Sequence, residues 1–381
     1  MVDQPWLSKL IGTALGTELE VRVGTNNAWF AGEVFSDWTS LEVHRSLFSA
    51  AGSFKINTPH ARPWPMRPDT EVSISMGGEP VLAGYVDALN SSVTGETKSL
   101  SFAGRDNTAA LADCTHENEP GEWHNLTVRE IVTEICKPFG VHVSAVGLTA
   151  DSSSADLLYN FRVQPGEKAW TAIDRLLRLR GYLAYSRGDG GLRISRLAAG
   201  DSGGEVIEGA NGNVLTSKIT WTHVNRHSIY KVRGQAVGGD ENWGTLVIQP
   251  EGSALDDGVQ RFRPLTVLAE GQIDSASADT RAQWEATYRA AKSASCKVTV
   301  QGWKRLQRDG DSKLWAVNET VWTEIPSQGL RQRLLIDDLT FRRSNDGGTT
   351  TTLNLVRRDA YNPKPEVSTD KEPFADLLGE L

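Results

Sequence analysis

Two stretches of the sequence align without a gap: VLAGYVDALNSSVTGETKSLSFAGRD (Val81 to Asp106) and LLIDDLTFRRSNDGGTTTTLNLVRRD (Leu334 to Asp359). The matched pairs include Leu82 with Leu335, Gly95 with Gly348, Thr97 with Thr350, Leu100 with Leu353, and Arg105-Asp106 with Arg358-Asp359. Each stretch has the apolar alternation and central glycine of an antiparallel hairpin. We interpret them as two copies of one β-unit. The alternative is a chance likeness, because any two hairpins share these features.

Two related units in one chain indicate a quasi-symmetric protomer. A ring of three such chains would present six similar units, which could sit coaxially on a hexameric tube while each chain differs elsewhere. The pattern therefore favours an adaptor over an enzyme.

The whole sequence predicts a mainly β fold with α+β parts. We expect two related antiparallel β-barrel-like domains, a middle α+β domain and helical insertions. The predicted boundaries are residues 1–115 for the first β-barrel-like domain, 116–200 for the α+β domain, 201–365 for the second β-barrel-like domain, and 366–381 for a flexible C-terminal tail. The tail could form a short docking helix with Phe374, Leu377 and Leu378.

Within the first domain, residues 19–113 alternate between apolar and polar with turn breaks. The segment His60 to Pro68 is rich in proline, which donates no ladder hydrogen bond, so we expect a connecting loop there.

In the middle region, Thr127 and Glu130 form a capping box, and Leu126 with Ile131 forms a possible hydrophobic staple, so a helix should begin there and close at Pro138 and Gly140. A strand is predicted at 141–143 and a second helix from about 166 to 180, with Gly181 as its cap. A hairpin should join 182–185 to 192–194 across the turn at 188–191.

The cluster AGDSGG at 199–204 predicts a linker into the second β-rich region. That region should contain strands at 219–223, 229–232, 245–248, 297–300 and 314–325, and an inserted helix near 277–292. Trp284, Tyr288 and Ala291 should lie on one side of this helix.

Composition limits the function classes. The 381 residues are 39% hydrophobic and 23% charged, which is ordinary for a globular protein. The net charge of −8 argues against general nucleic-acid binding, which needs concentrated Lys and Arg. Three widely spaced cysteines, Cys114, Cys136 and Cys296, indicate buried free thiols. The N-terminus has no signal-peptide or membrane-span pattern, so we expect folding in the cytoplasm.

No catalytic, cofactor-binding or metal-binding residue is assigned from the sequence. A metal could be held by the cluster of His116, Glu117, Glu119, Glu122 and His124, but Pro120-Gly121 breaks any helix there, so a polar loop is favoured. His223 and His227 would share a face of a strand but lack a third ligand.

The acid pairs Asp256-Asp257 and Asp337-Asp338 point to opposite strand faces and so do not form a facing pair. Six tryptophans could support stacking on sugars or bases, although core or subunit contact is favoured; they are Trp29, Trp38, Trp64, Trp303, Trp315 and Trp322.

Several segments in order resemble the baseplate hub proteins of contractile phage tails of the Mu type, which are relatives of the T4-type hub and of the phage late control protein D group. The segments that carry the resemblance are Arg45-Ser46, Ala51 to Phe54, Val81 to Asp87, Gly104 to Asp106, Gly166 to Trp170 with the helix to Gly181, and Leu334 to Asp359. They extend from Leu19 to about Tyr361.

The resemblance implies a structural virion protein with no catalytic residues and no cofactor. It implies a homotrimeric ring with pseudo-sixfold symmetry that joins the hexameric tail tube to the trimeric central spike. DNA and tape-measure protein would pass through its channel, the DNA without specific binding, and no membrane would be involved. The expected location is the tail baseplate of the virion, assembled in the host cytoplasm. The alternative is a carbohydrate-binding or carbohydrate-active β-rich protein that uses exposed tryptophans and paired acids.

Overall fold

The computed structural model describes residues 19–23, 34–59, 64–95, 97–116, 121–148, 157–158, 161–178, 182–197, 200–235, 250–272, 275–306 and 312–358. They form two compact units, one within 1–219 and 296–355 and the other within 220–295 and 356–381. The predicted mainly β class is confirmed. The predicted division at 115, 200 and 365 stays a prediction. Among the described helices, none has the length and apolar character to cross a membrane.

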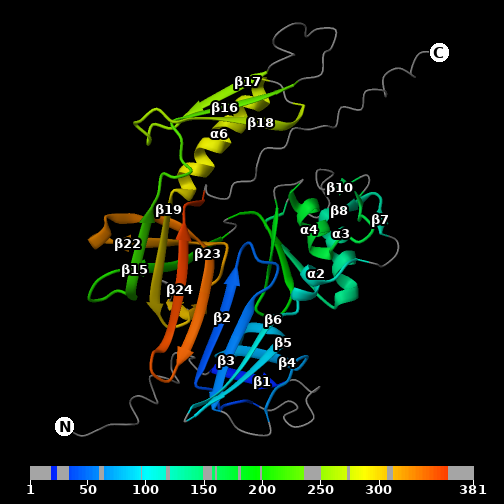
Figure 1. The fold of residues 1–381 in the computed structure, drawn as a ribbon, viewed down its shortest axis with the longest axis vertical. Helices are drawn as coiled ribbons and strands as arrows, with labels where there is room; N and C mark the ends of the chain where they lie inside the picture. Colours follow the sequence, from blue (N-terminus) through cyan, green and yellow to red (C-terminus); the bar gives the residue numbers. More distant parts are fainter. Residues whose placement is uncertain are drawn as a thin grey trace. The chain divides into compact units, whose positions relative to one another are not determined.

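One large sheet organises the first unit. Its twelve described strands are β1 (Leu19–Val23), β2 (Ser40–Ser46), β3 (Ser53–Pro59), β4 (Glu71–Met76), β5 (Glu79–Thr94), β6 (Thr97–Asp106), β14 (Gly200–Ile207), β15 (Val214–Trp221), β19 (Ala294–Gln301), β22 (Glu319–Ile325), β23 (Leu330–Ser344) and β24 (Gly348–Val356). The order across the sheet is β1-β4-β5-β6-β3-β2-β23-β24-β19-β15, and β22 joins β23 to β14. In Figure 1, β2 and β23 lie side by side at the centre of this sheet.

The predicted alternation produces the core of this sheet. Along β4, for example, Val72, Ile74 and Met76 are buried while the residues between them face outward. Alternate side chains on a strand point to opposite faces, so one face of the strand packs inward. The strands predicted between 19 and 113 are therefore confirmed, and the described part of the proline-rich segment, 64–68, is not in a strand.

The α+β region of the first unit contains short helices over a three-stranded sheet. Its elements are α2 (Ala109–Asp113), β7 (Glu122–Trp123), β8 (Leu126–Thr127), α3 (Val128–Cys136), η1 (Lys137–Phe139), β9 (Val143–Val146), β10 (Leu157–Leu158), β11 (Phe161–Arg162), α4 (Ala169–Arg178), β12 (Leu183–Ser186) and β13 (Leu192–Ser195). Both halves of the predicted capping box at Thr127 and Glu130 are present. The β12–β13 hairpin is confirmed. One apolar cluster joins α3 and α4 to this hairpin.

Two boundaries in this region differ from the prediction. The strand expected at 141–143 begins at Val143, because the Val141 amide still bonds to the Cys136 carbonyl in the turn that ends the helix. The helix expected from 166 begins at Ala169, since Gly166 is held in a turn with φ of 77°. The predicted cap Gly181 lies outside the described residues.

Two further predictions are wrong. The supposed linker at 199–204 is a strand from Gly200 onward, because β14 pairs in parallel with β22. Its glycine content has a packing reason: a Cβ on Gly204 would lie 2.5 Å from Cδ of Arg305. The strand expected over 314–325 is interrupted, since β21 (Ser312–Leu314) pairs with β20 (Lys304–Leu306) and β22 begins only after Asn318, whose φ is 65°. The single-turn helix η3 (Pro326–Gln328) follows β22.

The second unit contains a three-stranded sheet and one long helix. Its elements are β16 (Ile229–Gln235), β17 (Glu251–Leu255), β18 (Pro264–Gln272) and α6 (Ser275–Lys292). Ala278 and Ala282 of α6 pack on Val232, and the helix approaches so closely that a Cβ on Gly252 would lie 2.1 Å from the Ala278 carbonyl carbon. The inserted helix is confirmed, with Trp284 and Tyr288 stacked on it. The strand predicted at 245–248 and the tail after 361 lie outside the described residues.

Candidate functional site: two equivalent hairpins and their edges

The two aligned stretches form equivalent hairpins, β5–β6 and β23–β24. A shift of 253 residues superimposes their buried positions: Leu82 with Leu335, Val86 with Leu339, Leu100 with Leu353, and Phe102 with Leu355. The matched turn glycines also share a backbone conformation, with φ of 45° at Gly95 and 66° at Gly348. Both positions favour glycine, because other residues rarely adopt a positive φ. Matched burial and matched turn geometry support duplication over chance likeness.

The strands around each hairpin are equivalent as well. In the first copy the order across the sheet is β4-β5-β6-β3-β2, and in the second it is β22-β23-β24-β19-β15. Both sets follow one connectivity along the chain. The two neighbouring strands at one end of the set come first (β2 and β3, or β15 and β19), then the strand at the other end (β4 or β22), and then the hairpin. The duplication therefore extends to five strands, which the sequence alignment of two strands did not reveal.

One long strand joins the two copies. The first part of β23 pairs with β22, from Leu330 with Ile325 to Leu335 with Thr320. Its second part pairs on the same edge with β2, from Asp338 with Ser46 to Ser344 with Ser40. The junction includes a 2.6 Å ion pair between Nε2 of His44 and Oδ2 of Asp338, which raises the pKa of His44. The sequence did not predict this junction, although the unusual length of β23 was a signal that the strand could pair with two different partners.

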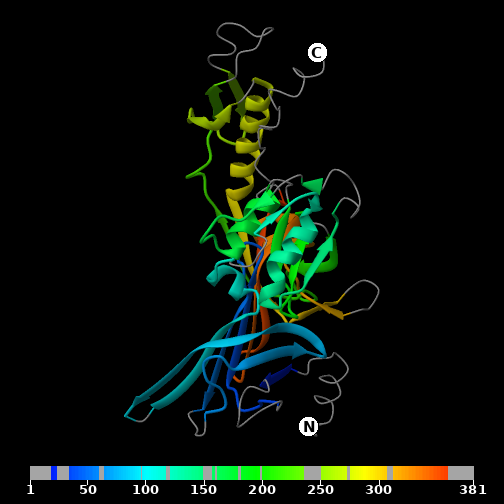
Figure 2. The same ribbon diagram turned by 90° about the vertical axis from the view of Figure 1, so that its right-hand side faces the viewer.

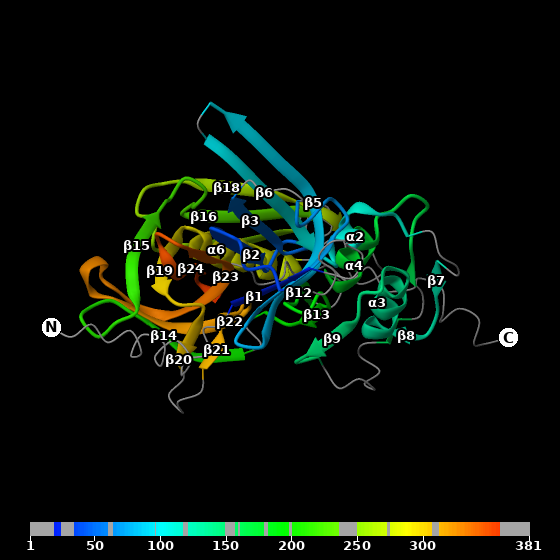
Figure 3. The same cartoon turned by 90° about the horizontal axis from the view of Figure 1, so that it is seen from below.

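The equivalent strand β5 has one partner fewer. Its first part pairs with β4 as far as Tyr85, just as β23 pairs with β22. Among the described strands, its neighbours are only β4 and β6, so no strand takes the place that β2 takes beside β23. The hairpin of β5 and β6, drawn in cyan, extends well beyond β3 and β4 in Figures 2 and 3.

The second uncovered edge belongs to β15. This strand occupies the place of β2 in the second copy and ends the sheet, with β19 as its only described strand neighbour. At one point its edge is occupied by a side chain, since the exposed amide of Gln328 donates to the Ser217 carbonyl. Leu215 on this strand is 54% exposed. An open strand edge with exposed apolar side chains can pair with another chain.

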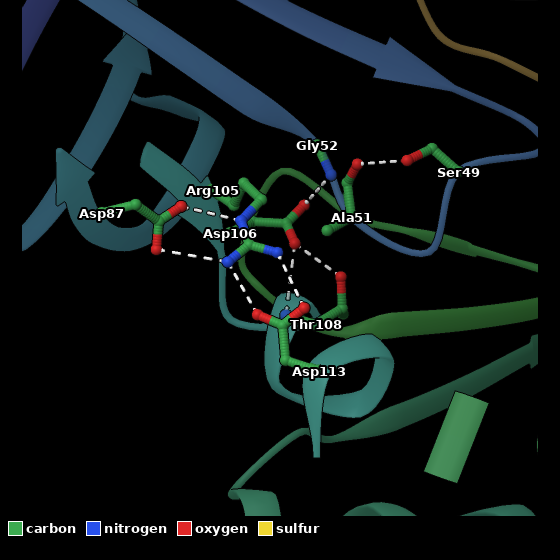
Figure 4. A network of polar contacts seen from close by, with 8 residues as sticks. All are labelled: Ser49, Ala51, Gly52, Asp87, Arg105, Asp106, Thr108 and Asp113. Carbon is green, nitrogen blue, oxygen red and sulfur yellow. Dashed lines mark hydrogen bonds and ion pairs between the residues drawn. The ribbon is translucent and has the colours of Figure 1, made fainter. Parts of the chain in front are cut away.

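A polar network fixes the base of the first hairpin, as Figure 4 shows. Arg105 forms ion pairs with Asp87 at 2.7 Å and with Asp113 at 2.7 Å, which lower the pKa of Asp113. The neighbouring Asp106 is buried and accepts from the amide of Gly52 at 2.7 Å and from the hydroxyl of Thr108 at 2.5 Å. Burial raises the pKa of Asp106 despite these bonds. In the first copy, the Arg-Asp ending therefore ties β6 to β5, to α2 and to Gly52, the residue before β3. In the second copy, Arg358 is exposed and Asp359 lies outside the described residues.

The residues weighed for metal binding lie in separate environments. His116 is buried with its ring 5.6 Å from that of Trp123, and burial lowers the pKa of the histidine. His124 is exposed and lies 3.4 Å from Glu122, whereas Glu117 and Glu119 lie outside the described residues. His223 and His227 flank a turn rather than sharing a strand. Within the described ranges, no three His, Cys, Asp or Glu side chains converge as a metal site.

The paired acids separate as expected for neighbours on a strand or turn. Asp256 binds Arg226 while Asp257 is exposed, and Asp337 accepts from Asn354 while Asp338 binds His44. Of the six tryptophans, Trp303 and Trp315 are buried, Trp38, Trp64 and Trp322 are partly buried, and Trp29 lies outside the described residues.

Comparisons with known proteins cover most of the chain. Residues 12–106 match the model of the Mu phage baseplate assembly protein GpP-like N-terminal domain, 108–196 that of the baseplate hub protein gp44-like second domain, and 274–364 that of the GpP fourth domain. The baseplate hub protein gp44 of Escherichia phage Mu is 30% identical over 338 residues, which is 87% of each chain.

Solved structures of tail proteins share the fold. The 43 kDa tail protein of prophage MuSo2 from Shewanella oneidensis has a TM-score of 0.73 and 28% identity, covering 90% of this chain and 99% of its own. A tail protein from Neisseria meningitidis MC58 has a TM-score of 0.68 and 20% identity, covering 91% of this chain and 98% of its own.

Proposed function

Because the chain belongs to the family of baseplate hub proteins of Mu-type contractile phage tails, we propose that it assembles as a trimeric, pseudo-sixfold ring. The ring would join the hexameric tail tube to the trimeric central spike and surround the channel for DNA. Its relatives are structural tail proteins, so the location in the virion tail follows from the family. We further propose that it is not an enzyme and is assembled in the host cytoplasm.

The proposal rests on a difference between the two copies. A strand pairs with the second part of β23, whereas no described strand pairs with the same edge of the second part of β5. Within one chain, β2 of the first copy pairs antiparallel with the second part of β23. The equivalent contact would pair β15, the counterpart of β2, with the second part of β5, the counterpart of β23. Every chain contains both β15 and β5, yet within one chain these two strands are not paired. Two copies of the chain can therefore complete the missing junction.

Repetition of that junction closes a ring. Each chain would contribute one internal junction, β2 with β23, and one intermolecular junction, β15 with β5 of the next chain. If the two junctions have similar geometry, each copy of the unit is turned by a similar angle relative to its neighbour, and three chains make six alternating units. Pairing also covers two exposed strand edges, which would otherwise invite uncontrolled association.

The test is the molar mass of the purified chain by light scattering over a concentration series. We expect a species of three times 41.6 kDa that dissociates on dilution. A dimer, or a monomer at the highest soluble concentration, would contradict a ring that closes through these edges alone.

A further inference from the structure

A cavity of about 730 Å³, partly open to solvent, lies in the first unit. It is lined by the β12–β13 hairpin, the start of β5 at Glu79 and Pro80, Arg45 of β2, Arg305 of β20, and residues between Ser312 and Glu319. Its volume is within the range of sites that hold a small ligand or a few residues of a peptide.

The cavity is positively charged, although the chain carries a net charge of −8. Five cationic side chains line it, namely Arg45, Arg187, Arg193, Arg305 and Lys313. Three carboxylates line it as well, namely Glu79, Asp189 and Glu319. The lining therefore has two positive charges in excess.

Each of the three carboxylates already has a cation. Arg187 lies 2.6 Å from Asp189, and Lys304, just outside the lining, lies 2.7 Å from Glu79. Arg305 and Glu319 form an ion pair at 2.7 Å. Arg45, Arg193 and Lys313 form no ion pair within 4 Å among the described residues, although Glu319 lies near Arg193 and Lys313, and the buried Asp106 lies near Arg45.

Arg193 is the least satisfied of these. Its Nε is buried and has no hydrogen-bond partner among the described residues. Arg45 donates to the Ser186 carbonyl at 2.7 Å, and burial lowers its pKa. Because Nε is closed to solvent, an incoming carboxylate would bind the terminal nitrogens of this guanidinium.

The walls of the cavity are held in place. Asn318, in the left-handed conformation, donates to Ser195 Oγ at 3.2 Å and to the Arg196 carbonyl at 2.8 Å, which ties the segment before β22 to β13. On the opposite side, Gly188 lets the hairpin turn press against β5, because a Cβ there would lie 2.3 Å from the Pro80 carbonyl oxygen. The backbone segments that carry Arg187, Arg193 and Glu319 are thus held in place before any ligand arrives, which lowers the entropic cost of binding.

We propose that this cavity binds an acidic peptide segment of a neighbouring tail protein, with one carboxylate on Arg193 and a second near Lys313. A planar carboxylate fits the fork of a guanidinium, and two carboxylates would match the excess of two charges. Exposed acidic residues on a partner could then enter a site formed jointly by both β-units and the α+β region.

Nucleic acid is the less suitable ligand. A phosphate backbone carries a charge at every nucleotide and would meet the three lining carboxylates as well as the overall negative charge of the chain. A short peptide can place two carboxylates and avoid the others.

The experiment is calorimetric titration of the full chain at low salt with the blocked peptide Gly-Asp-Gly-Asp-Gly, with Gly-Asn-Gly-Asn-Gly as the neutral control. We expect saturable binding of the first peptide only. Arg193→Gln should weaken it about tenfold through loss of a charge-assisted bond, and Arg193→Lys should restore part of the affinity. Lys313→Gln should weaken it about threefold.

Lys297→Gln is the matched control, because it removes an exposed positive charge from β19 outside the cavity. It should leave the affinity unchanged, and circular dichroism should show that all variants are folded. The proposal is overturned if the acidic peptide does not bind saturably, or if it binds Arg193→Gln as tightly as the unaltered chain. Tighter binding of inorganic phosphate, in competition with the peptide, would overturn the peptide in favour of a phosphate ligand.

Discussion

At the residue scale, the two acids of the pair Asp256-Asp257 differ: Asp256 has a structural role, and Asp257 is exposed to solvent. Asp256 receives two hydrogen bonds from Arg226, at 2.6 and 2.8 Å, and its side chain is 8% exposed. Asp256→Asn would leave the mostly buried guanidinium without its counter-charge and should destabilise the second unit by about 2–3 kcal/mol. Asp257→Asn should change stability by less than about 0.5 kcal/mol. Hydrogen-exchange mass spectrometry of peptides from β17 and α6 measures both effects.

The same aspartate predicts a pH dependence. The bond from Arg226 holds the pKa of Asp256 below its usual value. A lowered pKa in the folded state contributes stability above the unfolded pKa of about 4, and that contribution is lost as pH falls through the folded pKa. Thermal unfolding of the unaltered chain and of Asp256→Asn should therefore differ at neutral pH and converge below about pH 4. A constant difference down to pH 3 would contradict the ion pair as its source.

Glycines in the first hairpin show why residue identity matters where the backbone is crowded. A Cβ on Gly104 would lie 2.0 Å from the Tyr85 carbonyl oxygen and 2.7 Å from the Phe54 ring. Gly104→Ala should therefore destabilise the first unit by about 3 kcal/mol or more, since the nearest atom is backbone. Gly95→Ala is the control: it has open space but a positive φ, and should cost about 1 kcal/mol. Urea unfolding monitored by tryptophan fluorescence would rank the two, and an equal cost would contradict the packing account.

At the element scale, local signals were sufficient for some elements and insufficient for others. The capping box at Thr127 and the apolar alternation of β4 act within a few residues, so the sequence predicted those elements. The strand β14 depends on β22, more than a hundred residues away, and its Gly204 leaves room for the side chain of Arg305. Glycine-rich composition alone cannot distinguish a linker from such a strand. The β2–β23 junction was missed for the same reason, because its two strands are distant in sequence.

The cationic cavity also depends on distant elements. Arg45, Arg193 and Lys313 come from three segments of the chain, each of which appears in the sequence as an ordinary charged position on a strand. Only the fold brings them together, so no spacing rule could have identified the site.

The uncovered edge of β5 gives a prediction for one element. Replacement of Ser92–Ser99 by Asn-Gly would shorten the hairpin and keep the buried Leu100 and Phe102. Asn-Gly favours the tight turn that joins two antiparallel strands. The shortened hairpin keeps Tyr85–Ser91, the counterpart of the part of β23 that pairs with β2, so light scattering should still show a folded trimer. Circular dichroism and thermal unfolding report whether the fold is retained.

A monomeric shortened chain would contradict this junction, because it would place the subunit contact in the tip of the hairpin instead. The β15 edge is tested separately. Leu215→Lys adds a charge to that exposed strand and should weaken the trimer, because a charge on an edge strand opposes pairing with another chain.

At the scale of the whole molecule, the two copies of the β-unit differ mainly in what is inserted into them. In the first copy, β2 passes to β3 through six residues, 47–52. In the second, the equivalent step from β15 to β19 passes through 222–293, which contain the elements of the second unit. The first copy is followed by the α+β region, whereas β24 is the last described element of the second. These insertions, rather than the β-units, would make a ring of three chains threefold instead of sixfold.

This difference predicts what microscopy of the proposed ring should show. End-on class averages of the unaltered trimer should contain both threefold and sixfold rotational components, the sixfold component coming from alternating β-units. Replacement of residues 222–293 by a six-residue Gly/Ser loop keeps β15, β19 and both proposed junction edges. The shortened chain should remain trimeric, and its threefold component should fall relative to the sixfold one, without vanishing because the α+β region remains. An unchanged ratio of the two components would contradict residues 222–293 as a source of the threefold component.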